Sequence, residues 1–332
     1  MNLYPLTFRP RFVEKIWGGR KLQTVLGKSI PPTVPIGESW ELYDFPPGVV
    51  GSSKDWVSTE VAAGPLAGRS LHELVGEFGV DLYGSVPLSG PEGQFPILIK
   101  FLDAREDLSV QVHPDPAYSD AHPGAHLKTE AWYVLQSDPD SRLLKGLKPG
   151  TTREQFEAAI TRGDVEQFIN AIPTREGECF YLPSGTVHAL GAGLLVAEVQ
   201  TPSDTTFRVF DFNRIDSSTG KPRALHVEKA LKCIDFSATG ELDPRTSQSI
   251  RLVTSPYFYL ERNHLHPGSV HHLKSDQPTV LIITHGTVDL SARGVLEAVH
   301  VARGDVVLMP AALQTPVVSS GSGGSWLEVT FP

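Results

Sequence analysis

Three segments of the chain carry residue types that together could form one mononuclear metal site. They are the run Gln111-Val112-His113, the carboxylate Glu130, and His188, which follows the turn Pro183-Ser184-Gly185. In an extended strand alternate residues share a face, so Gln111 and His113 point the same way. Two imidazoles, a carboxylate and an amide oxygen suit a divalent ion such as zinc and leave room for water or substrate. The pattern therefore predicts an open metal site of the kind that catalysis needs.

A second histidine-rich segment competes with this assignment. His264 and His266 would share a strand face, and His271 would oppose them across a hairpin, with His272 beside it. The segment has no cysteine and few carboxylates, so we favour exposed strand histidines over a metal site. We interpret two further histidines, His122 and His126, as residues of the loop before Glu130.

Composition limits the classes of protein that need to be considered. The 332 residues allow two or three domains, and the formal net charge of -9 without a long Lys/Arg stripe argues against a nucleic-acid partner. The two cysteines, Cys179 and Cys233, have no metal-like spacing and suit buried thiols of a reducing compartment. We find no signal-peptide pattern at the start and no apolar run long enough to span a bilayer. These features predict a cytoplasmic protein without a membrane partner.

Short apolar runs separated by 27 prolines and 30 glycines predict a mainly β fold, either a sandwich or a barrel. The expected strands include residues 95–102, 194–200, 257–261, 280–284, 306–309 and 326–331. A minority of helices interrupts them. Capping-box patterns predict helices that start at Ser70, with Glu73, and at Thr151, with Glu154. Two further helices are expected over residues 164–170 and 226–234.

A faint internal repeat indicates two related barrels. Residues 177–183 and 304–310 share a glycine, an acidic second position, an apolar run and a final proline. The first copy continues to His188, whereas the second continues without a histidine. We therefore expect a metal-binding domain over residues 1–240 and a C-terminal domain without metal ligands over residues 241–332.

Other polar residues would enter the same cavity as the metal ligands. Glu198 follows the His188 turn on a later strand and would face inward, while Arg208 follows a polar turn. Lys100 lies in an apolar stretch and Lys128 lies next to the candidate metal ligand Glu130, so neither lysine looks like an exposed residue that only keeps the protein soluble. Taken alone, Arg208 fits a surface cation as well. Together these residues describe a cavity with a metal, a carboxylate and several cations.

At these positions the chain resembles the type I mannose-6-phosphate isomerases, also called phosphomannose isomerases, in their short bacterial form. The similarity runs in family order over roughly the first two-thirds of the chain. The matching stretches are residues 16–19, 37–41, 98–104, 108–114, 128–133, 183–190 and 198–208. One departure is Thr129, which stands where other members often have proline between Lys128 and Glu130.

The resemblance implies two cupin (jelly-roll) barrels, one zinc ion per chain, and interconversion of mannose 6-phosphate and fructose 6-phosphate through an enediol. It assigns zinc to the ligands Gln111, His113, Glu130 and His188. It implies catalytic roles for Arg208 and for Glu198 as a proton-transferring group, and it places Lys100, Ser109 and Lys128 in the substrate pocket. The expected partner is a sugar phosphate, and the expected assembly is a monomer or weak homodimer.

Two other functions remain open from the residues themselves. An iron-dependent cupin oxygenase would also use two histidines and a carboxylate. The cations Lys100, Lys128 and Arg208 argue against it, since oxygen chemistry does not need them. A non-catalytic sugar-phosphate-binding cupin would keep the pocket but show no turnover.

Overall fold

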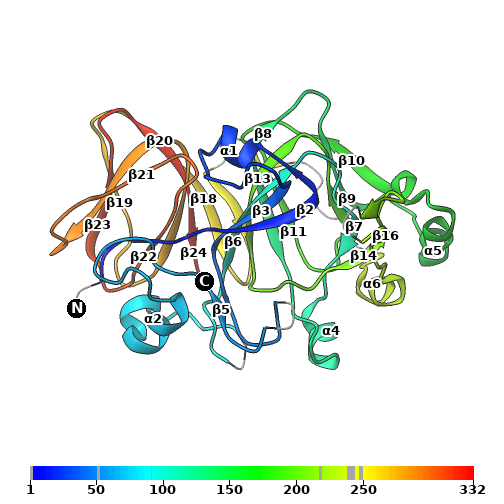
Figure 1. Cartoon of the computed structure of the whole chain (residues 1–332), viewed down its shortest axis with the longest axis horizontal. Coiled ribbons are helices and arrows are strands. Elements are labelled where there is room, and N and C mark those ends of the chain that lie inside the picture. Colours follow the sequence, from blue (N-terminus) through cyan, green and yellow to red (C-terminus); the bar gives the residue numbers. More distant parts are fainter. Residues whose placement is uncertain (1–2, 51–52, 91, 217–218, 238–243, 247–249) are drawn as a thin grey trace.

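The structure is a computed structural model, and strands dominate it (Figure 1). The described residues are 3–50, 53–90, 92–216, 219–237, 244–246 and 250–332. Two groups of strands lie side by side in Figure 1, one from the first two-thirds of the chain and one from the last third. The prediction of a mainly β fold with a minority of helices is confirmed.

Two sheets form the first barrel. One sheet has the strand order β11-β8-β13-β6-β2-β3, and the other has the order β10-β9-β12-β7-β14. Side chains of both sheets meet in one buried cluster that includes Leu102, Trp132 and Val196 from the first sheet and Leu143 and Leu190 from the second. The strands are β2 (Arg11–Gly19), β3 (Ile36–Leu42), β6 (Leu98–Ala104), β7 (Val110–Val112), β8 (Glu130–Ser137), β9 (Arg142–Leu147), β10 (Ile169–Pro173), β11 (Cys179–Leu182), β12 (His188–Leu190), β13 (Leu194–Gln200) and β14 (Phe207–Phe210).

The second barrel repeats part of this order. Its strands β22-β20-β24-β18 follow the same succession as β11-β8-β13-β6, and the two repeated sequence segments supply the equivalent strands β22 and β11. The faint repeat therefore marks equivalent places in two similar sheets. The strands are β1 (Leu6–Thr7), β17 (Arg251–Thr254), β18 (Tyr259–Leu265), β19 (Val270–His272), β20 (Thr279–Arg293), β21 (Val299–Ala302), β22 (Val306–Met309), β23 (Gln314–Ser319) and β24 (Gly324–Thr330).

The N-terminal segment contributes to the sheet of the second barrel. Strand β1 pairs antiparallel with β22, so that Leu6 lies opposite Leu308. The expected boundary between residues 240 and 241 lies outside the described residues. The division into domains 1–240 and 241–332 therefore stays a prediction.

Strand β6 shows why its sequence looks like an uninterrupted apolar run. All seven of its residues are buried. Ile99 and Phe101 face a core that also contains Leu260 and Val329 of the second barrel. Alternate residues point to the opposite face, which lines the interior of the first barrel. Lys100 lies on that interior face and is only 4% exposed. The position of Lys100 within an apolar stretch of sequence therefore reflects its place in the interior of the first barrel.

The helices match the capping predictions to within one residue. Helix α2 (Leu71–Phe78) begins with the expected capping box of Ser70 and Glu73. Helix α5 (Arg153–Arg162) is capped by Thr152 and Gln155, one residue later than predicted. The correction has a simple cause: Gln155, like glutamate, can accept a hydrogen bond from the backbone N–H of the N-cap residue.

The helix predicted over residues 164–170 is wrong at its last two residues. A 3₁₀ helix, η1 (Val165–Phe168), is followed directly by β10, which starts at Ile169 and pairs with β9. The helix expected over 226–234 is present as α6 (Val227–Cys233). Helix α4 (Pro116–Ala121), capped by Asp115, was not predicted and interrupts the expected loop before Glu130.

The remaining short elements are α1 (Lys21–Thr24), α3 (Val80–Tyr83), β4 (Asp44–Phe45), β5 (Val57–Ser58), β15 (Ile215–Asp216) and β16 (Lys221–Pro222). None of the described helices is long and apolar enough to cross a membrane.

Candidate active site

Three of the predicted metal ligands meet in the first barrel. His113 follows β7, Glu130 begins β8 and His188 begins β12. His188 Nε2 lies 3.2 Å from Glu130 Oε1, and His113 Nε2 lies 3.6 Å from Glu130 Oε2. One ligand atom from each residue falls within 4.8 Å of the others. Within the described ranges, this is the only group of three or more His, Cys, Asp or Glu side chains close enough to share an ion.

The two imidazole rings are oriented by backbone carbonyls. His113 Nδ1 lies 3.0 Å from the carbonyl oxygen of Thr205, and His188 Nδ1 lies 2.9 Å from that of Thr186. A carbonyl oxygen can only accept, so each Nδ1 carries the proton and donates. In the neutral form of each ring, Nε2 then presents a lone pair toward Glu130. Metal-ligating histidines are commonly held by such a hydrogen bond on the other ring nitrogen.

The residues fit a divalent cation. His113 Nε2 and both carboxylate oxygens of Glu130 are buried and have no hydrogen bond of good geometry, although Lys128 Nζ lies 2.7 Å from Glu130 Oε2. Burial opposes ionisation of Glu130, but Lys128 and His113 hold its pKa well below the ordinary value. Burial, reinforced by Lys128, lowers the pKa of His113 to about 3. A neutral imidazole and an ionised carboxylate are the protonation states in which these residues bind metal.

The fourth predicted ligand, Gln111, lies beside this group. It is directly opposite His188 in the β7–β12 register. Its amide nitrogen is 3.4 Å from His188 Nε2, while its amide oxygen accepts a hydrogen bond of 3.3 Å from Ser109 Oγ. Rotation of the amide by half a turn brings the oxygen to the same place. The structure thus brings Gln111 next to the other three, and its role as a ligand stays a prediction.

A cavity of about 210 Å³ lies next to the ligand group. Its walls include all five residues predicted for catalysis and substrate binding, together with Gln111. These five are Lys100, Ser109, Lys128, Glu198 and Arg208. The same walls hold Lys15, Trp17, Glu38, Asp204 and Arg223, none of which the sequence had singled out as a site residue.

Two buried carboxylates in this cavity share one lysine. Lys100 Nζ lies 3.8 Å from Glu198 Oε1 and 3.7 Å from Glu38 Oε2. Glu198 Oε2 also accepts a hydrogen bond of 2.8 Å from the indole N–H of Trp132. Lys15 adds a second cation on Glu38, at 2.9 Å.

The surroundings push the pKa values of the two carboxylates apart. Burial and then the negative charge of Glu130 raise the pKa of Glu198. Burial would also raise the pKa of Glu38, but Lys15 and Lys100 together lower it to about 2. One carboxylate therefore stays ionised while the other can exchange a proton closer to neutral pH. Such a separation is characteristic of acid–base pairs in active sites.

The guanidinium group of Arg208 forms no ion pair with any of the described residues. It lies on β14, opposite Gln111 of β7, which places it at the metal end of the cavity. Its Nε is buried and has no hydrogen-bond partner. Burial, and then the positive charge of Arg223, lowers its pKa. A partly buried cation of this kind is suited to an anionic group of a ligand.

Sequence patterns contained a signal for some of the missed residues only. Glu38 lies in the family-like stretch 37–41, and Lys15 directly precedes the stretch 16–19. Arg223 lies in no such stretch and follows β16, at a distance from every motif. Its place in the cavity depends on the path of the chain after β14.

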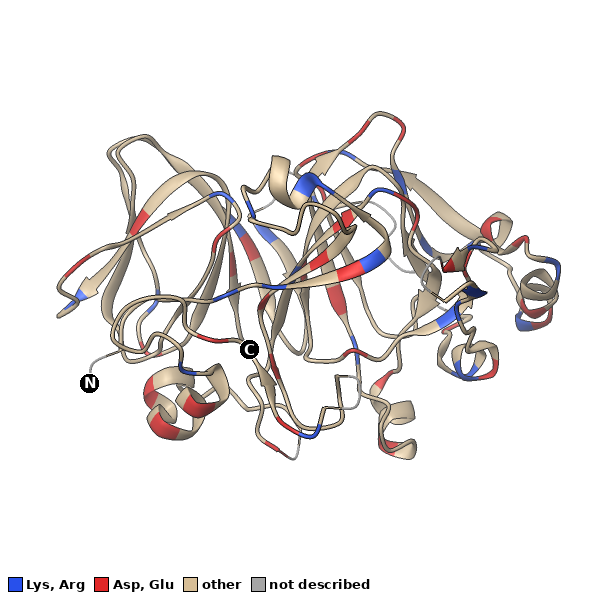
Figure 2. Ribbon diagram, viewed as in Figure 1, with Lys and Arg blue, Asp and Glu red and all other residues tan. Residues whose placement is uncertain are grey.

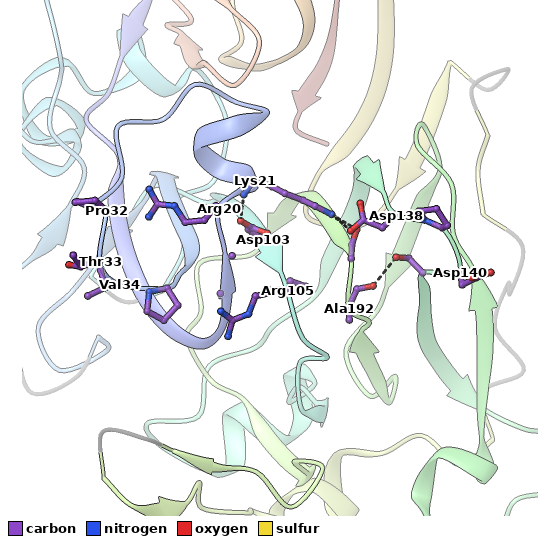
Figure 3. Close-up of a pocket in the computed structure, with 17 residues that line it drawn as sticks. Arg20, Lys21, Pro32, Thr33, Val34, Asp103, Arg105, Asp138, Asp140 and Ala192 are labelled. Atoms are coloured by element: carbon purple, nitrogen blue, oxygen red, sulfur yellow. Dashed lines mark hydrogen bonds and ion pairs between the residues drawn. The ribbon is translucent and has the colours of Figure 1, made fainter.

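A larger cavity, of about 800 Å³, lies elsewhere and contains none of the predicted site residues. Figure 3 shows its lining, in which Lys21 reaches Asp138 and Asp103 accepts from the backbone of Lys21. These charged groups already have partners within the protein. Over the whole molecule, acidic and basic positions are interspersed on both barrels (Figure 2).

The competing histidine segment does not form the arrangement considered from the sequence. His264 and His266 are exposed, and β18 pairs with β17 and β24 while β19 pairs with β23. The expected hairpin between them is therefore absent from this described part of the chain. His271 instead lies 3.7 Å from Glu328. The two cysteines are buried and free, as predicted.

Comparison with known proteins identifies the family. The model of the phosphomannose isomerase type I catalytic domain matches residues 6–140. A mannose-6-phosphate isomerase of Streptococcus mutans is 34% identical over 316 residues, covering 94% of each chain. The mannose-6-phosphate isomerase ManA of Bacillus subtilis is 36% identical over 290 residues, covering 85% of each.

Solved structures agree with this assignment. The crystal structure of the mannose 6-phosphate isomerase from Bacillus subtilis superposes with a TM-score of 0.83 at 30% identity, covering 99% of both chains. The apo form of the Salmonella typhimurium enzyme, at 15% identity, a TM-score of 0.70 and 98% coverage of both chains, shares the fold. The expected pair of cupin barrels is thus confirmed. Sequence identity over almost the whole chain, together with this fold, shows that the protein belongs to the family of type I mannose-6-phosphate isomerases.

Proposed function

We propose that this chain interconverts mannose 6-phosphate and fructose 6-phosphate with one zinc ion, held by Gln111, His113, Glu130 and His188. The observation that carries the proposal is the buried His–Glu–His group next to a cavity rich in cations. In this group His113 Nε2 and both carboxylate oxygens of Glu130 have no hydrogen bond of good geometry with the described residues. The isomerases of Streptococcus mutans and Bacillus subtilis are named for mannose 6-phosphate, and fructose 6-phosphate is the ketose that the family resemblance implies.

An aldose–ketose isomerase moves a proton between two adjacent carbons, and an enediol is the intermediate that we propose. The obstacle is the weak acidity of the carbon, because negative charge develops on the sugar oxygens as the proton leaves. A bound zinc ion would act as a Lewis acid on these oxygens, and such a contribution can reach several kcal/mol. Arg208 adds a positive charge at the same end of the cavity, where its guanidinium group is partly buried.

Glu198 is the group that we propose for proton transfer. It is 3% exposed and faces the cavity, and its raised pKa brings it closer to the range in which it can both accept and release a proton. The hydrogen bond from Trp132 to Oε2 fixes the carboxylate plane. This leaves Oε1, 3.8 Å from Lys100, as the oxygen that would take the proton from the sugar.

Lys100, Ser109 and Lys128 are proposed to contact and orient the substrate. Their side chains line the same cavity as Glu198 and Arg208. Contacts to the parts of the sugar phosphate that do not react would hold the reacting carbons next to Glu198. Such positioning lowers the entropic cost of reaching the transition state. We further propose that the enzyme works in the cytoplasm as a monomer or weak homodimer, which size-exclusion chromatography over a concentration series would test.

A coupled assay tests the proposed reaction directly. Fructose 6-phosphate formation from mannose 6-phosphate would be followed before chelation, after chelation, and after zinc return. Loss of activity with chelator and recovery with zinc is the expected result. Folded, zinc-loaded protein without turnover would contradict the proposal. Binding of the sugar phosphate without turnover would then favour a non-catalytic binding protein. Oxygen uptake by iron-loaded protein would favour an oxygenase.

A further inference from the structure

Thr129 stands between two residues of the candidate site and carries a buried hydroxyl group. Its neighbours in the chain are Lys128 and Glu130, and the residue is only 1% exposed. It is not among the residues that line the active-site cavity. Any effect of its side chain on the metal group must therefore pass through the segments that the side chain holds.

The hydroxyl group holds the end of β11 and the turn that follows this strand. Thr129 Oγ1 accepts a hydrogen bond of 3.2 Å from the backbone N–H of Ser184. It also lies 3.4 Å from the carbonyl oxygen of Leu182 and 3.4 Å from the hydroxyl oxygen of Tyr181, to either of which it can donate. Leu182 is opposite Glu130 in the β11–β8 register. The hydroxyl thus fixes the start of the turn relative to the carboxylate ligand.

This turn, residues 183–186, contacts both histidines of the candidate metal group. The N–H of Gly185 donates 3.1 Å to the carbonyl oxygen of His113, and the carbonyl oxygen of Thr186 accepts from His188 Nδ1 at 2.9 Å. A further hydrogen bond of 3.1 Å closes the turn between its first and last residues. A displacement of the turn would therefore move the backbone of one histidine and the ring of the other.

The backbone of Thr129 provides a second connection to His113. Its N–H donates 3.2 Å to Thr201 Oγ1, and its carbonyl oxygen accepts from the N–H of Thr201 at 3.1 Å. The loop that begins there leads to Thr205, whose carbonyl oxygen lies 3.0 Å from His113 Nδ1. Proline, which other members of the family often have in place of Thr129, has neither an N–H nor a hydroxyl. Both connections therefore depend on the threonine of this chain.

We propose that Thr129 is a positioning residue of the metal site, whose hydroxyl fixes the turn 183–186 against Glu130 and so sets the spacing of the three ligand side chains. The proposal rests on the proposed function, because it takes zinc as the ion that these side chains hold. Groups that orient metal ligands alter metal affinity although they never touch the ion. Loss of the hydroxyl should therefore weaken the metal site in a protein that still folds.

The Thr129→Val variant removes the hydroxyl and keeps the branched shape of the side chain. We expect the zinc dissociation constant of the full chain, measured by competition with a chromophoric chelator, to rise roughly 10-fold. This is the lower end of the range for groups that orient metal ligands, because the hydroxyl acts through the turn. Thr129→Ser retains the hydroxyl and should restore the affinity of the wild type.

Thr174→Val is the matched control. Thr174 is a buried threonine of the same barrel, and its hydroxyl donates 3.1 Å to the carbonyl oxygen of Ser141. It lies at the other end of β8 from Glu130, where its own carbonyl oxygen accepts from Ser137 Oγ at 2.8 Å. Both valine variants should lose thermal stability when metal-free, but only Thr129→Val should bind zinc more weakly. An equal loss of zinc affinity in both variants would overturn the proposal, since general destabilisation would then explain it.

Cobalt provides a readout of geometry that a change in stability alone would not move. The visible absorption of bound Co²⁺ depends on the arrangement of its ligands. The spectrum should therefore change in Thr129→Val and return to that of the wild type in Thr129→Ser. If Thr129→Val does not fold, Thr129→Ala also lacks the hydroxyl and should show the same weaker zinc binding and altered spectrum. Wild-type values in that variant would exclude the role.

None of these measurements needs turnover, so the role of Thr129 and the proposed reaction can fail separately. Equal zinc affinity of the wild type and Thr129→Val would exclude this role and leave the proposed reaction untouched. A wild-type protein that binds no zinc would overturn both, because the ligands would then have no ion to hold.

Discussion

The Lys100→Met variant should shift the pH dependence of catalysis. Lys100 is the cation that Glu198 and Glu38 share, at 3.8 Å and 3.7 Å, in a part of the barrel almost closed to water. Methionine retains much of the volume of the side chain and removes the charge. Without that charge, ionised Glu198 loses its attraction to Lys100, so its already raised pKa should rise further.

Coulomb's law gives the size of the effect. Two unit charges at the 3.8 Å separation of Lys100 and Glu198 interact by about 4 kcal/mol at an effective dielectric constant of about 20. That energy corresponds to roughly 3 pKa units. Because the neighbouring cations and water partly compensate, we expect an upward shift of about 1 to 3 units. The ionised form is the one that accepts a proton, so activity should be lost on the acidic side and return at higher pH.

The measurement is kcat/KM for mannose 6-phosphate over the pH range in which the protein stays folded. The acidic limb of the Lys100→Met profile should lie at higher pH than that of the wild type, and its plateau should be lower because a proposed substrate contact is lost. Lys15→Met is the matched control, because Lys15 contacts Glu38 but makes no ion pair with Glu198. Its acidic limb should stay close to the wild-type position. A Lys100→Met profile that is lowered equally at every pH would refute the assignment of Glu198 as the titrating base.

Three further predictions concern the metal and the charge around it. His188→Ala should remove bound zinc and activity together, since it deletes a proposed ligand; elemental analysis that finds one zinc per chain in this variant would contradict the site. Arg208→Ala should keep zinc and lower kcat by roughly 100-fold or more, as for loss of a charge-stabilising donor, and unchanged turnover would exclude it from the mechanism. Zinc content and activity should stay intact when four histidines of the second barrel are changed to alanine, namely His264, His266, His271 and His272. Loss of zinc in this variant would show that the metal binds there.

Local periodicity explains which parts of the site could be predicted from the sequence. The alternation of a strand places Gln111 and His113 on one face, and the same rule turns Glu198 into the barrel. Both predictions can be made from residues that are close together in the sequence. The capping boxes of α2 and α5 are equally local, and here the prediction failed only by one residue at Thr152.

Contacts between distant segments explain what the sequence could not predict. Lys100 on β6 meets Glu38 of β3 because these two strands pair in the folded sheet, with Trp40 opposite Lys100. Arg223 reaches the cavity because its segment returns along β14. The same reason applies to β10, where pairing with β9 draws Ile169 into a strand although the preceding residues form a helical turn.

The two barrels show that similar strand order does not imply similar chemistry. Glu130 begins β8 and lies opposite Leu182, the last residue of β11. In the second barrel the equivalent place is taken by Thr279, which begins β20 and lies opposite the last residue of β22. Thr279 is buried and its hydroxyl has no hydrogen-bond partner. On the neighbouring strands, Gln200 ends β13 opposite Glu130, and Thr330 ends β24 directly after Val329, which lies opposite Val280. A threonine hydroxyl cannot supply the negative charge of a carboxylate at this interior position, and the second copy of the repeat also lacks the histidine that follows the first. The repeat therefore predicts the architecture of both barrels, whereas these individual residues distinguish the barrel with the His–Glu–His group from the one without it.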